Sequence, residues 1–287
     1  MAAMLRRTIV SLAMLTLSAA PALAEELTNA QRDAAITFTL NNTRHTLLHE
    51  IGHMFIDQLD LPVLGKEEDA VDTFATLVML EEGTPASIEG LVDTMDGWIY
   101  TDRQAPRRGY SNSDFYGMHS LDIQRSFAMA CLMVAHDYDG FTWLATRVGL
   151  PHDRQETCVE DLRLARNGWR DVLAPHVRDD YSPNRKVSVV YRNHDEAYDE
   201  AVAILKQSRI LENTADWLRK SYVLPRPVRL TAEECGQVNA FYDPSTREVI
   251  LCYEWADYFF ELFVNDVMPV REHFALIREL KLEKMGR

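Results

Sequence analysis

Two histidines separated by three residues, His49 and His53, constrain this chain more than any other feature of its sequence. The residues around them, 44–59, contain no proline and repeat apolar side chains at helical spacing. Side chains four positions apart lie on the same face of a helix. Two imidazoles one turn apart can therefore bind one metal ion, and the sequence predicts a helix that presents a metal site.

Glu50 follows the first histidine and completes the pattern H-E-x-x-H. Zn²⁺ binds imidazole nitrogen at about 2.0–2.1 Å, and the glutamate of this pattern serves as general base to a zinc-activated water. Two unrelated histidines on a surface helix are the alternative. Glycine in a helix interior is less stable than alanine by roughly 1 kcal/mol. Gly52 therefore suggests that another backbone packs closely against the helix at this point, where a larger side chain would not fit.

A catalytic zinc site needs a third protein ligand and one open position. The next segment supplies four acidic candidates within six positions, namely Glu67, Glu68, Asp69 and Asp72. Such a run is also typical of a solvated helix start, where acids interact favourably with the helix dipole. We expect a helix over residues 66–82 that ends at Gly83.

The segment 68–75 resembles the E-x-x-A-D-x-F-A element of the gluzincin metallopeptidases, with Val71 where alanine is usual. This resemblance implies that Glu68 is the third zinc ligand. It also implies that Asp72, one turn further on, orients a ligating histidine.

Three segments, 49–53, 61–69 and 235–254, are similar to a bacterial family of metallopeptidases of unknown function. The resemblance runs over most of the chain and is most specific at the zinc motif. It implies a zinc hydrolase of gluzincin type, without indicating a substrate.

A second group of candidates lies in the segment 110–125. Zinc peptidases require a donor that stabilises the developing oxyanion, and histidine, tyrosine and arginine all serve this purpose. His119 is the preferred candidate, followed by Tyr116 and Arg125. Ordinary packing is the alternative, since Asp122 and Arg125 have the spacing of a common helix-surface pair.

The first 24 residues have the features of a signal peptide: Arg6 and Arg7, an apolar run over 9–17, and small residues before Glu25. A retained membrane anchor is the alternative, but the run is short of the roughly 20 residues that span a bilayer. We expect a periplasmic or secreted protein. Its formal charge of −14 disfavours nucleic acid and anionic membranes as partners.

The four cysteines suggest disulfides in an exported chain. Three connectivities are possible, and proximity in the sequence favours Cys131–Cys158 and Cys235–Cys252.

The predicted fold class is α+β, mostly helical and zincin-like. Strand patterns occur at 186–191, 223–230, 238–242 and 248–253, the last two as a hairpin. Residues 35–40 alternate like a strand but could also begin the motif helix. We hypothesise that the C-terminal strands pair beside 36–40 and complete a small sheet. Residues 25–287 would then form one composite domain, with a helical zinc-binding part (25–180), a linker near 179–186 and an α+β part (186–287).

These observations predict an exported zinc hydrolase, most simply a peptidase, in which His49, His53 and Glu68 bind Zn²⁺ and Glu50 is the base. The alternatives are an amidase acting on cell-wall or small amides, and a zinc-stabilised binding module without catalysis. A peptide or protein substrate is the expected partner, and the oligomeric state stays open. Four hairpin residues could also line the cleft, although a purely structural role is the simpler expectation: Asn239, Tyr242, Tyr253 and Glu254.

Overall fold

The computed structural model describes residues 26–104, 110–179 and 186–285. The expected signal peptide and most of the expected linker lie outside these residues. No helix within the described ranges is both long enough and apolar enough to cross a membrane.

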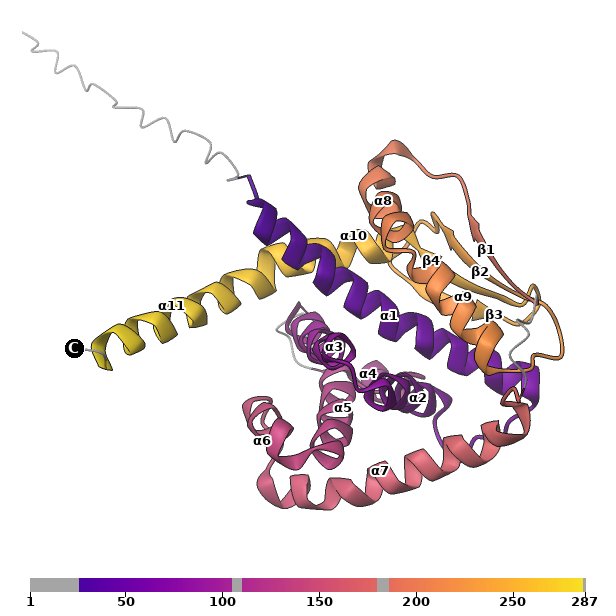
Figure 1. Ribbon diagram of the computed structural model, residues 1–287, viewed down its shortest axis with the longest axis horizontal. Helices are drawn as coiled ribbons and strands as arrows, with labels where there is room; N and C mark the ends of the chain where they lie inside the picture. The colour runs from indigo at the N-terminus through magenta and orange to yellow at the C-terminus, as the bar shows by residue number, and fades with distance from the viewer. Residues whose placement is uncertain (1–25, 105–109, 180–185, 286–287) are drawn as a thin grey trace, which may run out of the picture.

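One long helix, α1 (Asn29–Leu59), runs through the middle of the molecule and separates two groups of elements (Figure 1). It begins at a capping box formed by Thr28 and Gln31. The expected strand at 35–40 is wrong, and the alternative of a helix running into the motif is correct. Ala35, Phe38 and Thr39 are buried at helical rather than alternating spacing, which explains the difference.

The helical group lies on one side of α1. It contains α2 (Glu67–Glu82), α3 (Pro85–Gln104), the short α4 (Asn112–Tyr116), α5 (Asp122–His136), α6 (Tyr138–Arg147) and α7 (His152–Leu173). The end of α2 at Gly83, which has a positive φ of 59°, agrees with the prediction. The predicted Cys131–Cys158 disulfide is present and joins α5 to α7.

The second group contains a four-stranded sheet. Its strands are β1 (Val187–Tyr191), β2 (Val228–Glu233), β3 (Ala240–Asp243) and β4 (Glu248–Cys252), in the order β1-β2-β4-β3. The first three in this order are parallel, and β3 pairs antiparallel with β4 as the predicted hairpin. The Cys235–Cys252 disulfide is present as predicted. Since residues 36–40 are helical, the hypothesis that these strands pair beside them is wrong.

Helices complete the α+β part. α8 (Asp199–Ser208) and α9 (Ile210–Ser221) connect β1 to β2, and α10 (Tyr253–Leu262) follows β4. A π-helical stretch, Phe263–Val267, leads into α11 (Met268–Met285), which projects away from the body (Figure 1). Short 3₁₀ turns lie at Ala174–His176 and Glu196–Tyr198.

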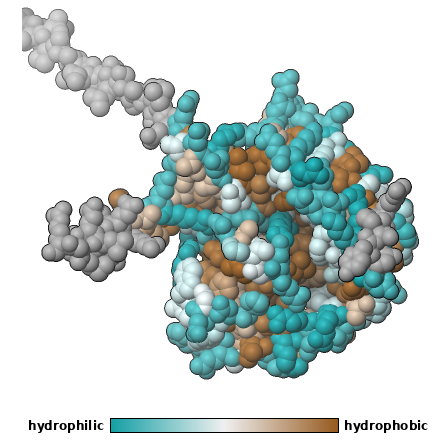
Figure 2. All heavy atoms as spheres, in the orientation of Figure 1, coloured by the Kyte–Doolittle hydropathy of each residue, from teal (hydrophilic) through white to brown (hydrophobic). Residues whose placement is uncertain are grey.

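The core draws on both groups of elements. One hydrophobic cluster combines Leu47, Ile51 and Phe55 of α1 with Leu230 and Val249 of the sheet. A second cluster fills the interior of the helical group. Hydrophilic residues cover most of the outer surface, and hydrophobic ones gather in the hollow near the centre of the view (Figure 2). Because α1 belongs to both parts of the core, we propose that residues 25–287 form one composite domain.

Candidate metal centre

Close packing of α1 against α2 positions the candidate ligands. A Cβ atom placed on Gly52 would lie 2.8 Å from the Cβ of Val71 and 3.3 Å from its Cα. The two backbones therefore approach more closely than a larger residue at position 52 allows. This approach brings Glu68 and Asp72, which flank Val71 on α2, opposite the two histidines of α1.

We expect a Gly52→Ala substitution to separate these helices, to destabilise the fold by about 1–3 kcal/mol as overpacking does, and to weaken metal binding. Gly168→Ala is the matched control, because a Cβ at that α7 position has no neighbour within 4 Å. Urea unfolding and a zinc-chelator competition measure both effects. Unchanged stability and affinity in the Gly52 variant would show that the close packing does not position the ligands.

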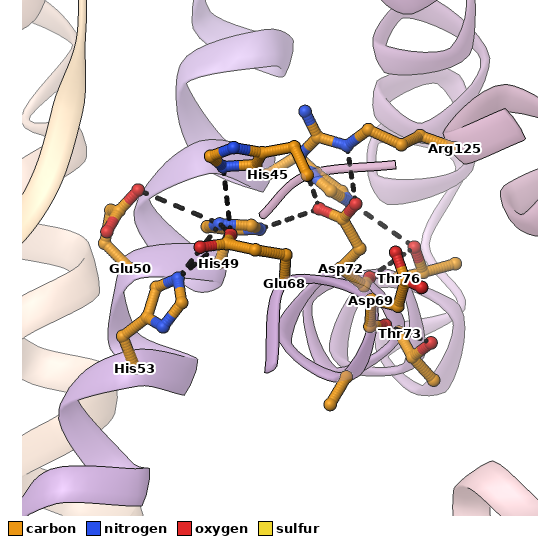
Figure 3. Close-up of polar contacts among 12 residues, drawn as sticks. His45, His49, Glu50, His53, Glu68, Asp69, Asp72, Thr73, Thr76 and Arg125 are labelled. Atoms are coloured by element: carbon orange, nitrogen blue, oxygen red, sulfur yellow. Dashed lines mark hydrogen bonds and ion pairs between the residues drawn. The ribbon is translucent and has the colours of Figure 1, made fainter. Parts of the chain in front are cut away.

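Three donor atoms face one another between the helices (Figure 3). Nε2 of His49 lies 3.3 Å from Nε2 of His53, and Oε2 of Glu68 lies 3.2 Å from the first and 3.3 Å from the second. In a tetrahedral zinc site with ligand distances of about 2.0–2.2 Å, neighbouring ligand atoms are about 3.3–3.6 Å apart. The spacing of these three atoms is close to that of three ligands of one ion.

The central carboxylate oxygen has an unusual environment. Oε2 of Glu68 is buried and has no hydrogen-bond partner of acceptable geometry among the described residues, although three imidazole nitrogens lie within 3.3 Å of it. Buried polar atoms normally have a partner. A cation shared with the imidazoles would satisfy this oxygen, so the residues present fit a metal ion.

Carboxylates fix the other nitrogen of each histidine. Nδ1 of His49 lies 2.7 Å from Oδ1 of Asp72, and Nδ1 of His53 lies 2.7 Å from Oε1 of Glu67. An N–H donated from Nδ1 to a carboxylate selects the tautomer in which Nε2 is free to bind a metal. The family resemblance implied this contact for Asp72, whereas Glu67 was considered only as another ligand.

Arg125 binds Asp72 from α5. Its guanidinium donates to both oxygens of Asp72, from Nε at 2.6 Å and from Nη2 at 2.7 Å. It also stacks over the ring of Trp98, 3.6 Å from the ring centroid. Two of its three guanidinium nitrogens are therefore bound to Asp72. Arg125 also lines a cavity beside the centre, and its service as an oxyanion donor stays a prediction.

The electrostatics of the centre favour positive charge. Burial alone lowers the pKa of His49, but the hydrogen bond with Asp72 and the nearby carboxylate of Glu68 outweigh it and raise this pKa to about 9. The pKa of His53 is raised in the same way, with burial again opposing and Glu68 and Glu67 prevailing. Burial opposes ionisation of Glu68, yet the surrounding histidines hold its pKa well below its usual range. A cluster that attracts protons so strongly also suits a bound cation.

Glu50 lies beside this centre without joining it. Its Oε1 is 4.0 Å from Nε2 of His49, and its carboxylate accepts a hydrogen bond from the backbone N–H of Tyr242 on β3. Burial raises the pKa of Glu50, as suits a group that must take up a proton. The contact with β3 was not predictable from the motif, because it joins residues far apart in the sequence.

His119 approaches the centre from the loop between α4 and α5. Its Nε2 lies 3.0 Å from Oε2 of Glu68, and its side chain is 54% exposed. Its ring is nearly parallel to that of His49, at 16° and 6.3 Å between centroids. Tyr116, the tyrosine among the three oxyanion candidates, is 79% exposed. It lines neither of the two cavities that adjoin the centre.

Two cavities adjoin the centre, with volumes of about 480 and 790 Å³. Five residues line both of them and mark the place where they meet: His49, Glu50, His119, Asn239 and Ala240. The centre therefore lies in a cleft between α1 and the edge strand β3.

The four hairpin residues considered for the cleft divide into two pairs. Asn239 and Tyr242 line the cavities. Tyr253 is buried and donates to the carbonyl of Arg192, and Glu254 accepts from the backbone N–H groups of residues 235 and 236. Tyr253 and Glu254 therefore have the purely structural role that was the simpler expectation from the sequence.

The fold and this donor set together define a class: an α+β protein with a candidate metal centre of two histidines and a glutamate. The chain belongs to the family described as "Putative metallopeptidase", whose model matches residues 6–173 and 191–277. Neither a curated protein nor a solved structure matches the chain.

Proposed function

We propose that this protein is an exported zinc-dependent hydrolase that cleaves peptide bonds. The observation that carries the proposal is the spacing of Nε2 of His49, Nε2 of His53 and Oε2 of Glu68 at 3.2–3.3 Å. Two imidazoles and one carboxylate are a donor set of catalytic zinc sites. When bound, zinc supplies a Lewis acid that polarises a carbonyl group and makes water a better nucleophile.

The chain's own residues divide the remaining work. His49, His53 and Glu68 would hold the ion, and a glutamate supplied by the helix after the motif helix supports the gluzincin type. Asp72 and Glu67 orient the two imidazoles through Nδ1. Arg125 holds Asp72 in place.

Glu50 is the proposed general base. It takes a proton from the attacking water and passes it to the nitrogen of the leaving amine. Its burial, its raised pKa and its place at the junction of the two cavities support this role. The backbone N–H of Tyr242 favours the ionised form of this carboxylate, which is the form that accepts the proton.

His119 is the proposed donor to the carbonyl oxygen that gains negative charge during attack. We expect His119→Ala to lower kcat by about 10²–10³-fold, the usual loss for one such donor, while the protein keeps its zinc. Peptide hydrolysis and metal analysis of the same sample measure both quantities. Loss of zinc together with activity would instead make His119 a ligand, since its Nε2 also lies within 4.8 Å of the His49 and Glu68 donor atoms.

The size of the cleft favours a peptide over a small amide. The two cavities meet at the centre and together extend along β3, which leaves room for a chain on both sides of the scissile bond. Export after cleavage near Ala24 agrees with the two disulfides, which form in oxidising compartments.

A substrate panel separates the proposal from its rivals. The zinc-loaded protein is incubated with an unstructured protein, peptidoglycan fragments and small amides, and products are identified by mass spectrometry. Cleavage within the protein substrate supports a peptidase. Release of cell-wall fragments alone would support the amidase. Zinc binding without turnover of any substrate would support the binding module.

A further inference from the structure

The smaller cavity has an aromatic wall. It is formed by Trp98 from α3, by Trp255, Tyr258 and Phe259 from α10, and by Val238 from the loop before β3. Asp122 and Arg125 of α5 also line the cavity. Its volume of about 480 Å³ lies within the range of small-molecule binding sites. It opens directly beside the metal centre, because His49, Glu50 and His119 also line it.

This wall is not a closed interior. Three residues of the cavity carry a buried nitrogen without a hydrogen-bond partner among the described residues: Nδ1 of His45, Nε1 of Trp98 and Nε1 of Trp255. His45 and Trp98 are themselves at most 9% exposed. Since buried polar atoms rarely lack partners, these nitrogens indicate a space that holds water or a ligand in solution.

The larger cavity has a different character. Apart from the residues of the centre, three charged residues line it, namely Asp57, Lys66 and Glu67. Apolar and aromatic residues also line it, namely Ile56, Met118, Phe241, Tyr242 and Pro244. Its lining mixes charged groups with apolar ones, and none of the described residues in it is a tryptophan. The two sides of the metal centre therefore differ in their aromatic residues, because the two tryptophans line the smaller cavity and not the larger one.

We propose that the aromatic cavity binds a bulky aromatic side chain of the substrate residue on one side of the scissile bond. This inference rests on the proposed peptidase function and adds a substrate class to it. An aromatic side chain buries more apolar surface in such a pocket than a small one does. Offset ring contacts with the tryptophans add to this preference.

The first test uses two peptide series with one scissile bond. In each series a single residue next to that bond, either before or after it, is varied among Phe, Tyr, Leu, Ala and Asp. We expect kcat/KM of the zinc-loaded protein to be about 10–100-fold higher for aromatic residues than for Ala, the usual range for a hydrophobic pocket. The preference should occur in one series only. Equal rates within both series, or the same preference in both, would overturn the inference while leaving the peptidase function intact.

A matched pair of variants locates the pocket. Val238→Asp introduces a charge at the wall, and Val223→Asp introduces the same charge outside both cavities, where the valine is equally exposed at 49%. We expect only the Val238 variant to lose the aromatic preference, while the Val223 variant hydrolyses the Phe and Ala peptides as wild type does. Equal preference in the two variants would contradict the assignment of the pocket.

Binding without turnover separates the inference from the proposed function. Calorimetry with the zinc-loaded Glu50→Gln protein compares the Phe and Ala peptides, and we expect about 10-fold or tighter binding of the Phe peptide. If wild type cleaves no peptide but this difference remains, the function fails and the pocket stands. If binding is equal for both peptides, the pocket assignment fails.

Discussion

The Glu50→Gln protein is expected to bind metal as wild type does and to hydrolyse peptides about 10²–10⁴-fold more slowly. Glutamine keeps the size of the side chain and can still accept the backbone N–H of Tyr242, so the cleft should keep its shape. It cannot take up a proton from water. The loss should therefore fall on kcat rather than on KM.

Metal analysis and thermal melting of the same preparation serve as controls for this variant. Unchanged zinc content and melting temperature show that only proton transfer was removed. Activity close to that of wild type would contradict the role of Glu50 as general base, although the ligand set could still stand.

Removal of the metal is expected to lower the melting temperature by on the order of 10 °C. The ligands lie on two helices, α1 and α2, and face one another only in the folded chain. A ligand present at about 1,000 times its Kd stabilises the native state by about 4 kcal/mol, and each kcal/mol shifts the melting temperature by about 2–4 °C in a chain of this size. Calorimetry with and without a chelator measures the shift.

The Glu68→Ala protein is the control for this experiment. It lacks one ligand, so chelator should hardly change its melting temperature. A similar shift in both proteins would mean that the stabilising metal binds elsewhere. No shift in wild type would mean that the centre contributes nothing to stability.

Features encoded by local patterns were predictable from the sequence. The motif helix, the acidic helix ending at Gly83 and the β3–β4 hairpin follow from periodicity and turn residues within short segments. Both disulfides followed from proximity in the sequence. The family resemblance supplied the choice of Glu68 among neighbouring acids, which spacing alone left open.

Features that depend on distant contacts were not predictable. The pattern of residues 35–40 fits a strand and a helix equally well. The helix forms because the side chains that are buried in this segment, where α1 packs against α3 and α10, are spaced as on a helix. The contact of Glu67 with His53 and the hydrogen bond from Tyr242 to Glu50 depend on how α1 meets α2 and β3. No pattern in the neighbouring sequence predicted that the ring of Trp98 would lie beneath the guanidinium of Arg125.

Metal content of the purified protein tests the central claim most directly. Wild type is compared with three variants, Glu68→Ala, Asp72→Ala and Asp69→Ala. Asp69 is the control position, because in wild type its carboxylate accepts a hydrogen bond from Ser120 and not from a histidine. The account predicts about one zinc per chain in wild type and in the Asp69 variant, weaker binding by about 10–100-fold in the Asp72 variant, and loss of zinc in the Glu68 variant. Wild type without zinc, or a Glu68 variant that keeps it, would contradict the proposed metal centre.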